Sequence, residues 1–412
     1  MKRILFVTYS YPNAHKSASV LCTHRVIKCV QDSGLYDVHV LCYQFDNEEQ
    51  EMLLDGINIH RVRPTRWLRY LDGLQMSRKH ESLRHIMTII QKLFAMWCYP
   101  KMLPVSYERL KKASQLLHNK VSFDIVISEH YCVESLLCGC SLMNKYGVKH
   151  IAILWDPIKG QTVTHYLPKS FTDNRIEKIE NFAINNSSLI ISTGTMKEYY
   201  RNIEDGAFGK RKFLGFPGII APEKDADVNV SQYIREGYIN IVYSGQLSSV
   251  YRNPIPVVDL FNNCTYASKI NLIFFAMGDV KERLDSFSFK GNLSNNGYIP
   301  INELHTIYRH ADFLLNISHT NANMVPSKLF EYMSYGKPII SAYITEGDAA
   351  EKVLTHYPES LVLNLNQSII ENSNKLESFL EAKHNYVPFE SVQEIYKDNT
   401  PDAYLELINN SV

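Results

Sequence analysis

The sequence predicts an α/β protein built from two doubly wound domains. Short apolar runs alternate with helical patterns along the chain, which is typical of parallel strands covered by helices. The alternation restarts after a polar, turn-rich stretch in the middle of the chain. The length of 412 residues also exceeds what one hydrophobic core usually supports. We therefore expect two α/β domains of similar size.

The first domain is expected to span residues 1–216. Its first apolar run, Ile4–Tyr9, is typical of a central strand buried on both faces. A loop at Ser10–Ser19 follows, and then a helical pattern that ends at Gly34. Further strands of this domain are expected at Val38–Tyr43, Gly56–Val62, Asp124–Ser128, His150–Trp155 and Leu189–Ser192.

The second domain is expected at residues 237–388, after a linker at 217–236 that is rich in proline and charged residues. Its strands are expected at Ile239–Ser244, Ile270–Met277, Phe313–Ser318 and Pro338–Tyr343. The last segment, 389–412, carries apolar residues at helical spacing and needs a surface to cover them. We expect it to pack back on the first domain.

Composition restricts the classes of function. Lys plus Arg and Asp plus Glu both number 43, so the chain as a whole has no bias toward nucleic acid. None of its eight cysteines forms a Cys-x-x-Cys pair, which favours reduced thiols over a metal or disulfide framework. No apolar run is long enough for a signal peptide core or a membrane span. We expect a cytoplasmic protein.

Residues 61–112 differ from the rest of the chain. They hold twelve basic and three acidic residues, with apolar side chains at helical spacing between Leu83 and Trp97. Such a stripe is commonly the core-facing side of a long helix. The excess of positive charge also favours contact with an anionic membrane or a pyrophosphate-bearing acceptor. Both interpretations stay open at this point.

The segment Ser318–Ile340 carries the strongest local signal for chemistry. It reads as a strand end, a polar loop and a helix that begins near Pro326 and ends at Gly336. The unpaired N–H groups at a helix N-terminus attract anions, and Lys328 in the first turn adds a full positive charge. Glu331 follows one turn later, within reach of a diol such as a ribose attached to a bound phosphate.

The residues 326–340 resemble the donor-site signature of family-four glycosyltransferases with the GT-B fold, of the bacterial surface polysaccharide type. The resemblance implies two Rossmann-like domains that face each other across a cleft, with the nucleotide sugar bound by the second domain. Residues 242–254 are similar to the family's glycine loop and phosphate-binding arginine. The donor-binding residues that the resemblance implies are Gly245, Arg252, Tyr298, Ile299, Met324, Val325, Lys328 and Glu331.

Some positions depart from the family pattern. The family has a second glutamate eight positions before Glu331, where this chain has Asn323. An amide still forms hydrogen bonds with sugar hydroxyls but carries no charge. No Lys-Gly pair follows Arg252, so Lys328 is expected to take the role of that lysine. The opening loop at Ser10–Ser19 lacks the family's Gly-Gly pair.

Candidate residues of the first domain lie at strand ends, where open α/β sheets bind ligands. By the resemblance His130 approaches the donor sugar, and we place it with Asn323 as a catalytic candidate. Glu129 and Asp156 are weaker candidates for contact with an acceptor hydroxyl. A histidine at a strand end and an amide in a loop are also common as structural residues.

The sequence as a whole indicates a glycosyltransferase that moves a sugar from a nucleotide-diphosphate sugar to an acceptor hydroxyl. By resemblance we expect retention of the anomeric configuration, a UDP-sugar donor and no metal or other cofactor. The expected acceptor is a glycan or a lipid-linked glycan, with peripheral contact to the inner face of a membrane through 61–112. The Asp225–Asp227 pair is not expected to bind metal because it lies in the polar linker. The alternatives are a sugar-nucleotide 2-epimerase on the same fold and a non-catalytic partner protein.

Overall fold

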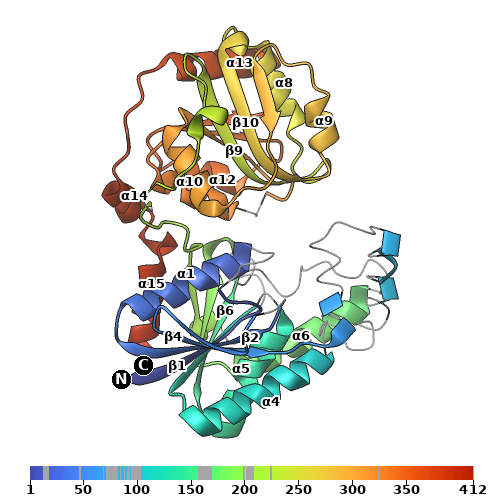
Figure 1. Cartoon of the computed structure of the whole chain (residues 1–412), viewed down its shortest axis with the longest axis vertical. Coiled ribbons are helices and arrows are strands. Elements are labelled where there is room, and N and C mark those ends of the chain that lie inside the picture. The colour runs from blue at the N-terminus through green and yellow to red at the C-terminus, as the bar shows by residue number, and fades with distance from the viewer. Residues whose placement is uncertain are drawn as a thin grey trace. The chain divides into compact units, whose positions relative to one another are not determined.

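The computed structural model describes most of the chain. The described residues are 1–12, 18–45, 48–67, 69–70, 82–83, 85–87, 89–90, 93, 104–130, 132–155, 169–197, 200, 208–222, 225–322 and 325–411. They divide into two compact units (Figure 1). The first unit comprises residues 1–216 and 401–412, and the second comprises residues 217–400.

The first unit is built on an eight-stranded sheet in the order β3-β4-β2-β1-β5-β6-β7-β8. All its strand pairs are parallel except β3 with β4, which is antiparallel. The strands are β1 (Lys2–Val7), β2 (Tyr36–Tyr43), β3 (Glu51–Leu54), β4 (Ile57–Val62), β5 (Ile125–Glu129), β6 (Lys149–Leu154), β7 (Leu189–Thr193) and β8 (Arg211–Leu214).

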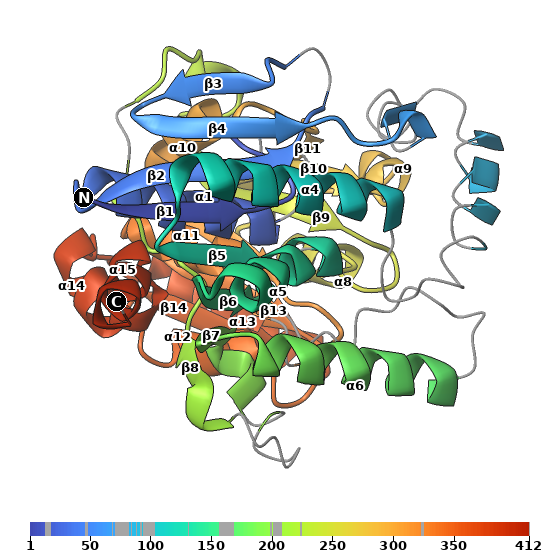
Figure 2. The same cartoon turned by 90° about the horizontal axis from the view of Figure 1, so that it is seen from below.

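Helices cover both faces of this sheet, because alternate residues of the buried strands point to opposite sides. On one face Ile4 and Phe6 of β1 share a core with α1 (Ala18–Asp32) and α15 (Pro401–Asn410). On the other face Leu5 and Val7 share a core with α4 (Pro104–Val121) and α5 (Val133–Tyr146). A further helix, α6 (Lys169–Asn185), extends the second layer, as Figure 2 shows.

The second unit is built on a six-stranded parallel sheet in the order β11-β10-β9-β12-β13-β14. Its strands are β9 (Ile239–Leu247), β10 (Ile270–Gly278), β11 (Asn292–Asn295), β12 (Phe313–Ile317), β13 (Ile339–Tyr343) and β14 (Ser360–Asn364). Its helices are α8 (Ile255–Asn263), α9 (Lys281–Asp285), α10 (Ile301–His310), α11 (Ser327–Ser334), α12 (Ala349–Leu354), α13 (Ile369–Glu381) and α14 (Phe389–Ile395). Alternating strands and helices thus form an α/β layer structure in each unit, as the sequence predicted.

Four strands were not predicted: β3, β8, β11 and β14. Each of them is the outermost strand of its sheet. An outermost strand has a neighbour on one side only, so it is short and does not need a continuous apolar run. The sequence of β11, Asn-Leu-Ser-Asn, and its half-buried side chains illustrate this. The predictions located the buried interior strands, whose apolar runs identify them, and missed the strands at both edges of each sheet.

In each sheet the strand order reverses at the first strand of the unit. In the first unit β1 lies between β2 and β5, and in the second unit β9 lies between β10 and β12. The connections leaving two such neighbouring strands run to opposite faces of the sheet, so a crevice forms at their carboxyl ends. In the second unit the segments that follow β9 and β12 leave the sheet at this edge.

Candidate functional site

Helix α11 begins at the carboxyl end of β12, in the segment that the sequence analysis singled out. Pro326 is its N-cap residue, with extended backbone dihedrals, and the helix runs from Ser327 to Ser334. Gly336 follows the last turn, and its φ of +61° lies in the left-handed region that favours glycine. The proline before the helix and the glycine after it fix the span of α11 much as the sequence predicted.

A charged cluster lies on the first two turns of α11. The Lys328 Nζ atom is 2.7 Å from Glu331 Oε1, and His305 Nε2 of α10 is 3.4 Å from the same oxygen. The Glu331 side chain is 2% exposed, whereas that of Lys328 is 30% exposed. A carboxylate this deeply buried is costly unless a cation or hydrogen-bond donor compensates it. Lys328 therefore neutralises Glu331 from the solvent side.

The segment after β9 carries the second basic residue of the site. Gly245 has a φ of +142°, and a Cβ atom there would lie 3.3 Å from the Tyr243 hydroxyl oxygen. Ser248 and Arg252 exchange two backbone hydrogen bonds of 3.1 and 3.0 Å, which close the intervening turn. Arg252 donates from Nη1 to the Gln246 carbonyl at 3.3 Å. The Nε atom of the same side chain is buried, so the guanidinium group is held in place against the β9 segment.

Tyr243 connects the two basic residues. Burial raises the pKa of Tyr243 to about 12, and both Arg252 and Lys328 act against that rise. Arg252 Nη1 and the Tyr243 hydroxyl both donate to the Gln246 carbonyl, at 3.3 and 3.2 Å. The Lys328 Nζ atom lies 6.0 Å from the ring centroid of Tyr308, whose hydroxyl is hydrogen-bonded to Ser244 next to Tyr243. The structure thus brings together Arg252 from the β9 segment and Lys328 from the β12 segment. Two cations beside a helix N-terminus favour binding of a phosphate or diphosphate.

Contacts between the segments after β9 and β12 hold the site in place. Thr320 donates its backbone N–H to the Tyr251 carbonyl at 2.9 Å, and the rings of Tyr251 and His319 stack with centroids 5.4 Å apart. Burial and the nearby Arg252 both lower the pKa of His319, which favours its neutral form. The Ala349 N–H donates to the Ala322 carbonyl at 2.8 Å, which fixes the end of the described segment 225–322.

Buried hydroxyl groups attach α11 to β9 beneath these loops. The Ser244 N–H donates to the Tyr332 hydroxyl at 2.8 Å, and the Ser244 hydroxyl is hydrogen-bonded to the Tyr308 hydroxyl. Burial and the charge of Glu331 raise the pKa of Tyr308, which keeps this phenol neutral and able to donate. The network couples α10, α11 and β9, so Glu331 and Lys328 are presented on a rigid support.

Several candidate residues lie away from the contacts just described or outside the described residues. Tyr298 and Ile299 follow β11, and the Tyr298 side chain is 78% exposed. Val325 is buried immediately before the N-cap of α11. Asn323, Met324 and Asp156 fall outside the described residues. The roles of all these residues toward a donor or acceptor stay predictions.

Glu129 lies at the carboxyl end of β5, next to the reversal of strand order in the first unit. Its buried carboxylate accepts hydrogen bonds from the hydroxyl groups of Thr8 and Thr23, from Tyr9 N at 3.3 Å and from Trp155 Nε1 at 3.3 Å. Burial raises the pKa of Glu129, and these hydrogen bonds act against that rise. The carboxylate joins β1, α1, β5 and the end of β6, which is a structural role.

His130 follows Glu129 and is also buried. Its backbone N–H donates to the Ile153 carbonyl at 2.8 Å, so the main chain continues the β5–β6 ladder by one residue. Its approach to a donor sugar stays a prediction, as does contact of Glu129 with an acceptor.

Sequence reasoning missed His305, His319 and the tyrosines 243, 308 and 332. Tyr243 and Tyr332 lie inside the two motifs that were recognised, beside Gly245 and Glu331, so a closer reading of those motifs would have found them. His305 lies on α10, in a segment with no motif of its own. Only the packing of α10 against α11 reveals its proximity to Glu331.

The basic segment 61–112 is described in part. Arg61 is buried, and its Nε atom lies 3.5 Å from the Glu48 carboxylate, so this residue belongs to the interior of the first unit. The described residues 82–83, 85–87, 89–90 and 93 are helical, and residues 104–112 belong to α4. The exposed apolar side chains of this helical part are Leu83, Ile86, Ile89, Ile90 and Leu93.

The described residues show neither a membrane-spanning helix nor a cluster of metal ligands. No helix among them combines the length and hydropathy that crossing a bilayer requires. The same residues contain no group of three His, Cys, Asp or Glu side chains placed to hold a metal ion.

Solved structures share the architecture of this chain. No protein-family model matches the sequence, and no curated protein matches it significantly. Sucrose-phosphate synthase from Thermosynechococcus elongatus matches in structure with a TM-score of 0.67 at 12% identity, over 100% of this chain and 98% of that chain. The catalytic domain of starch synthase IV from Arabidopsis thaliana, bound to ADP and acarbose, matches with a TM-score of 0.63 at 11% identity, over 100% and 99%.

A putative UDP-N-acetylglucosamine 2-epimerase from Listeria monocytogenes also matches, with a TM-score of 0.57 at 9% identity, over 99% of this chain and 96% of that chain. At such low identity the likeness shows the fold alone. The chain has the GT-B fold, as its sequence predicted.

Replacing Lys328 tests whether it compensates the buried Glu331 carboxylate. The Lys328→Met variant leaves that charge without its closest cation, so we expect the free energy of unfolding to fall by about 2 kcal/mol. The Lys328→Met/Glu331→Gln double variant should recover most of the loss. Urea denaturation of the full chain measures both changes.

Lys375→Met is the matched control, because Lys375 pairs with Glu371 on α13 at 2.8 Å while both side chains are well exposed. An exposed pair of this kind contributes less than about 0.5 kcal/mol. Equal effects of the Lys328 and Lys375 substitutions would contradict the assignment.

Proposed function

We propose that this protein is a glycosyltransferase that transfers a sugar from a nucleotide-diphosphate sugar to an acceptor hydroxyl. The observation that carries the proposal is the meeting of the segments after β9 and β12, which carry Arg252 and, at the N-terminus of α11, Lys328. These groups lie at the carboxyl ends of β9 and β12, where the strand order reverses and α/β sheets bind ligands. The GT-B fold is consistent with the proposal.

The proposed reaction breaks the bond between the anomeric carbon and the diphosphate oxygen. Negative charge develops on the departing diphosphate, and donors fixed in advance at that point lower the barrier. Lys328, Arg252 and the N–H groups of α11 are the groups that we assign to this task. The anomeric carbon then bonds to the acceptor oxygen, and the acceptor proton passes to the departing diphosphate. Retention and independence from metal are part of the proposal and rest on the resemblance of residues 326–340.

Glu331 is assigned to the ribose of the donor. Its carboxylate is paired with Lys328, whose side chain is partly exposed and flexible enough to turn toward a phosphate. When Lys328 moves to the diphosphate, the carboxylate is exposed to the diol, whose hydroxyl groups then donate to it. On donor binding, the hydroxyl groups of the ribose thus replace the Lys328 ammonium group as the partners of the buried Glu331 carboxylate.

A sugar-nucleotide 2-epimerase is the first alternative, and a solved structure of the same fold carries that description. Such an enzyme needs carboxylates that act as acid and base. Glu331 is paired with Lys328, and Glu129 accepts hydrogen bonds from four donors. The structural setting of both carboxylates therefore favours transfer over epimerisation. A non-catalytic partner protein is the second alternative, and donor binding separates it from an enzyme.

A thermal-shift screen with UDP, GDP, ADP and their sugars tests the donor site. A ligand at about 100 times its dissociation constant stabilises the folded chain by about 2.7 kcal/mol. We expect one nucleotide class to raise the melting temperature, with and without EDTA. The Glu331→Gln variant should lose most of this shift, and the exposed Glu371→Gln variant on α13 should keep it.

Two outcomes would contradict the donor site. The first is that none of the nucleotides shifts the melting temperature of the full chain. The second is a shift that Glu331→Gln and Glu371→Gln leave equally unchanged, since the nucleotide would then bind elsewhere. A shift abolished by EDTA would contradict only the proposed independence from metal.

We include in the proposal a glycan or lipid-linked acceptor held by the first unit, and peripheral contact with an anionic membrane. The support is the exposed apolar side chains of Leu83, Ile86, Ile90 and Leu93, which recur at three- and four-residue spacing in a segment with excess positive charge.

Sedimentation with vesicles tests the membrane contact. The full chain should bind vesicles of phosphatidylglycerol and phosphatidylcholine and remain unbound with phosphatidylcholine alone, because the basic residues need an anionic surface. The Ile86→Glu/Leu93→Glu variant should lose binding. The Leu116→Glu variant changes an exposed leucine of α4 and should retain it. Equal binding to both kinds of vesicle would contradict the electrostatic part of the proposal.

A further inference from the structure

A pocket lies within the second unit, at the opposite edge of its sheet from the donor residues. It has a volume of about 440 Å³, which lies in the range of small-molecule sites. Ile239 at the start of β9, Phe313 at the start of β12 and Pro338 just before β13 are among its lining residues. These positions mark the amino ends of the parallel strands. None of the proposed donor-binding residues lines this pocket.

Three helices end at the pocket. The residues that follow α10, α11 and α13 all line it, namely Ala311, Gly336 and Ala382. The last carbonyl groups of a helix lack partners within the helix and carry partial negative charge. The three helix ends therefore give the pocket a partial negative charge, which disfavours an anionic ligand such as a phosphate.

The charged side chains at the pocket balance one another. Lys337 is half-buried, and burial lowers its pKa while Asp312 acts against that change. Among the described residues the Lys337 ammonium group has no hydrogen-bond or ion-pair partner at close range, so it can donate to a ligand. Asp312 accepts from Asn240 N at 2.7 Å. His384 is paired with Glu359, with 2.7 Å between His384 Nδ1 and Glu359 Oε2. The site thus combines donors and acceptors without a strong net charge.

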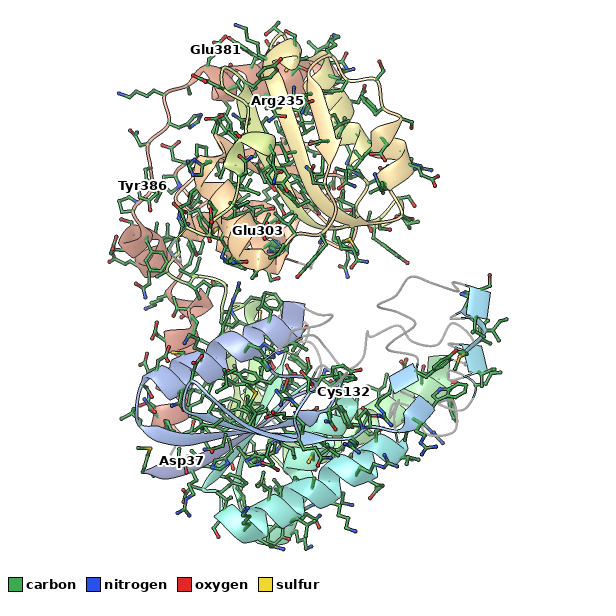
Figure 3. All side chains as sticks on the ribbon, viewed as in Figure 1. Asp37, Cys132, Arg235, Glu303, Glu381 and Tyr386 are labelled. Carbon is green, nitrogen blue, oxygen red and sulfur yellow. The ribbon has the colours of Figure 1, made fainter. Side chains whose placement is uncertain are left out.

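Tyr386 forms an exposed aromatic wall of the pocket. It lies on the extended connection between α13 and α14 (Figure 3), and its side chain is 62% exposed. The backbone is fixed on both sides of it, by Asn385 N donating to Glu359 at 3.1 Å and by Val387 N donating to the Gly336 carbonyl at 3.0 Å.

Gly336 also allows the Tyr386 ring to approach the main chain. A Cβ atom at Gly336 would lie 2.6 Å from Cε2 of that ring. Tyr238, a second partly exposed aromatic residue, lines the same pocket. An exposed aromatic ring on a fixed backbone is a ready contact surface, because little entropy is lost when a ligand packs on it.

We infer that this pocket binds a neutral oligosaccharide. A sugar ring presents an apolar C–H face, which packs on an aromatic ring, together with hydroxyl groups that both donate and accept hydrogen bonds. The tyrosines supply the aromatic faces, Asp312 accepts hydrogen bonds and Lys337 donates them. An anion would be repelled by the negative charge of the helix ends and of Asp312. A purely apolar ligand would bury these polar groups without hydrogen-bond partners. The inference does not depend on the proposed donor site.

Direct binding measurements on the full chain test the inference, with maltoheptaose, cellohexaose and chitohexaose as probes and inorganic phosphate as the anionic comparison. Titration calorimetry or saturation-transfer NMR should detect binding of at least one oligosaccharide and none of phosphate. Tyr386→Ala and Lys337→Met should each weaken it about tenfold, the effect of losing one aromatic or charge-assisted contact.

The controls keep a folding defect and the donor site apart from this pocket. Lys383→Met changes an exposed lysine of the same connection that does not line the pocket, and Ile370→Ala changes an exposed residue of α13. Both should bind like the unmodified chain, and so should Glu331→Gln, because Glu331 does not line the pocket. Each variant is first checked for an unchanged melting temperature.

Three results would overturn the inference. One is that no oligosaccharide binds to the unmodified chain. Another is that binding persists unchanged in both Tyr386→Ala and Lys337→Met. The third is that Glu331→Gln abolishes binding while the pocket variants do not, since the oligosaccharide would then occupy the donor site. The nucleotide screen tests only the donor site, and the oligosaccharide titration tests only this pocket. A negative result in one experiment therefore does not contradict the other proposal.

Discussion

The reversal of strand order between β9 and β12 is the constraint on which the rest of the candidate site depends. Strands that are parallel end at the same edge of the sheet, so the segments after β9 and β12 must meet there. The hydrogen bond from Thr320 to Tyr251 and the stacked rings of Tyr251 and His319 show this meeting directly. Arg252 and Lys328 belong to segments that follow different strands, β9 and β12, and the topology brings these segments to the same edge of the sheet.

Burial of Glu331 gives this edge its electrostatic character. A carboxylate with 2% exposure needs compensation, and Lys328 supplies it from one side while His305 lies on another. The tyrosine hydroxyl network beneath α11 keeps these groups in a fixed arrangement. In this account the stability of the second unit and its affinity for a diphosphate depend on the same lysine, which is why its substitution affects both.

The sequence was most informative where burial is complete on both faces of a strand. The interior strands of both sheets were predicted because burial on both faces requires a continuous apolar run. The outermost strands, such as β11, have a neighbour on one side only and lack such runs. The span of α11 followed from Pro326 and Gly336, because these residues have specific backbone requirements. His305 and the cavity beside Tyr386 were missed, since each is assembled from segments distant in sequence that only packing unites.

Hydrogen–deuterium exchange of the full chain, with UDP, GDP and ADP added in turn, tests the central claim most directly. Exchange reports the opening of each backbone amide, and a bound ligand slows it at the segments that it contacts. The account predicts slower exchange at residues 245–252 and 325–331 with one nucleotide. It predicts no change at residues 311–313 and 336–339, at the opposite edge of the same sheet. Protection confined to that opposite edge, or protection with none of the three nucleotides, would contradict a donor site at the carboxyl ends of β9 and β12.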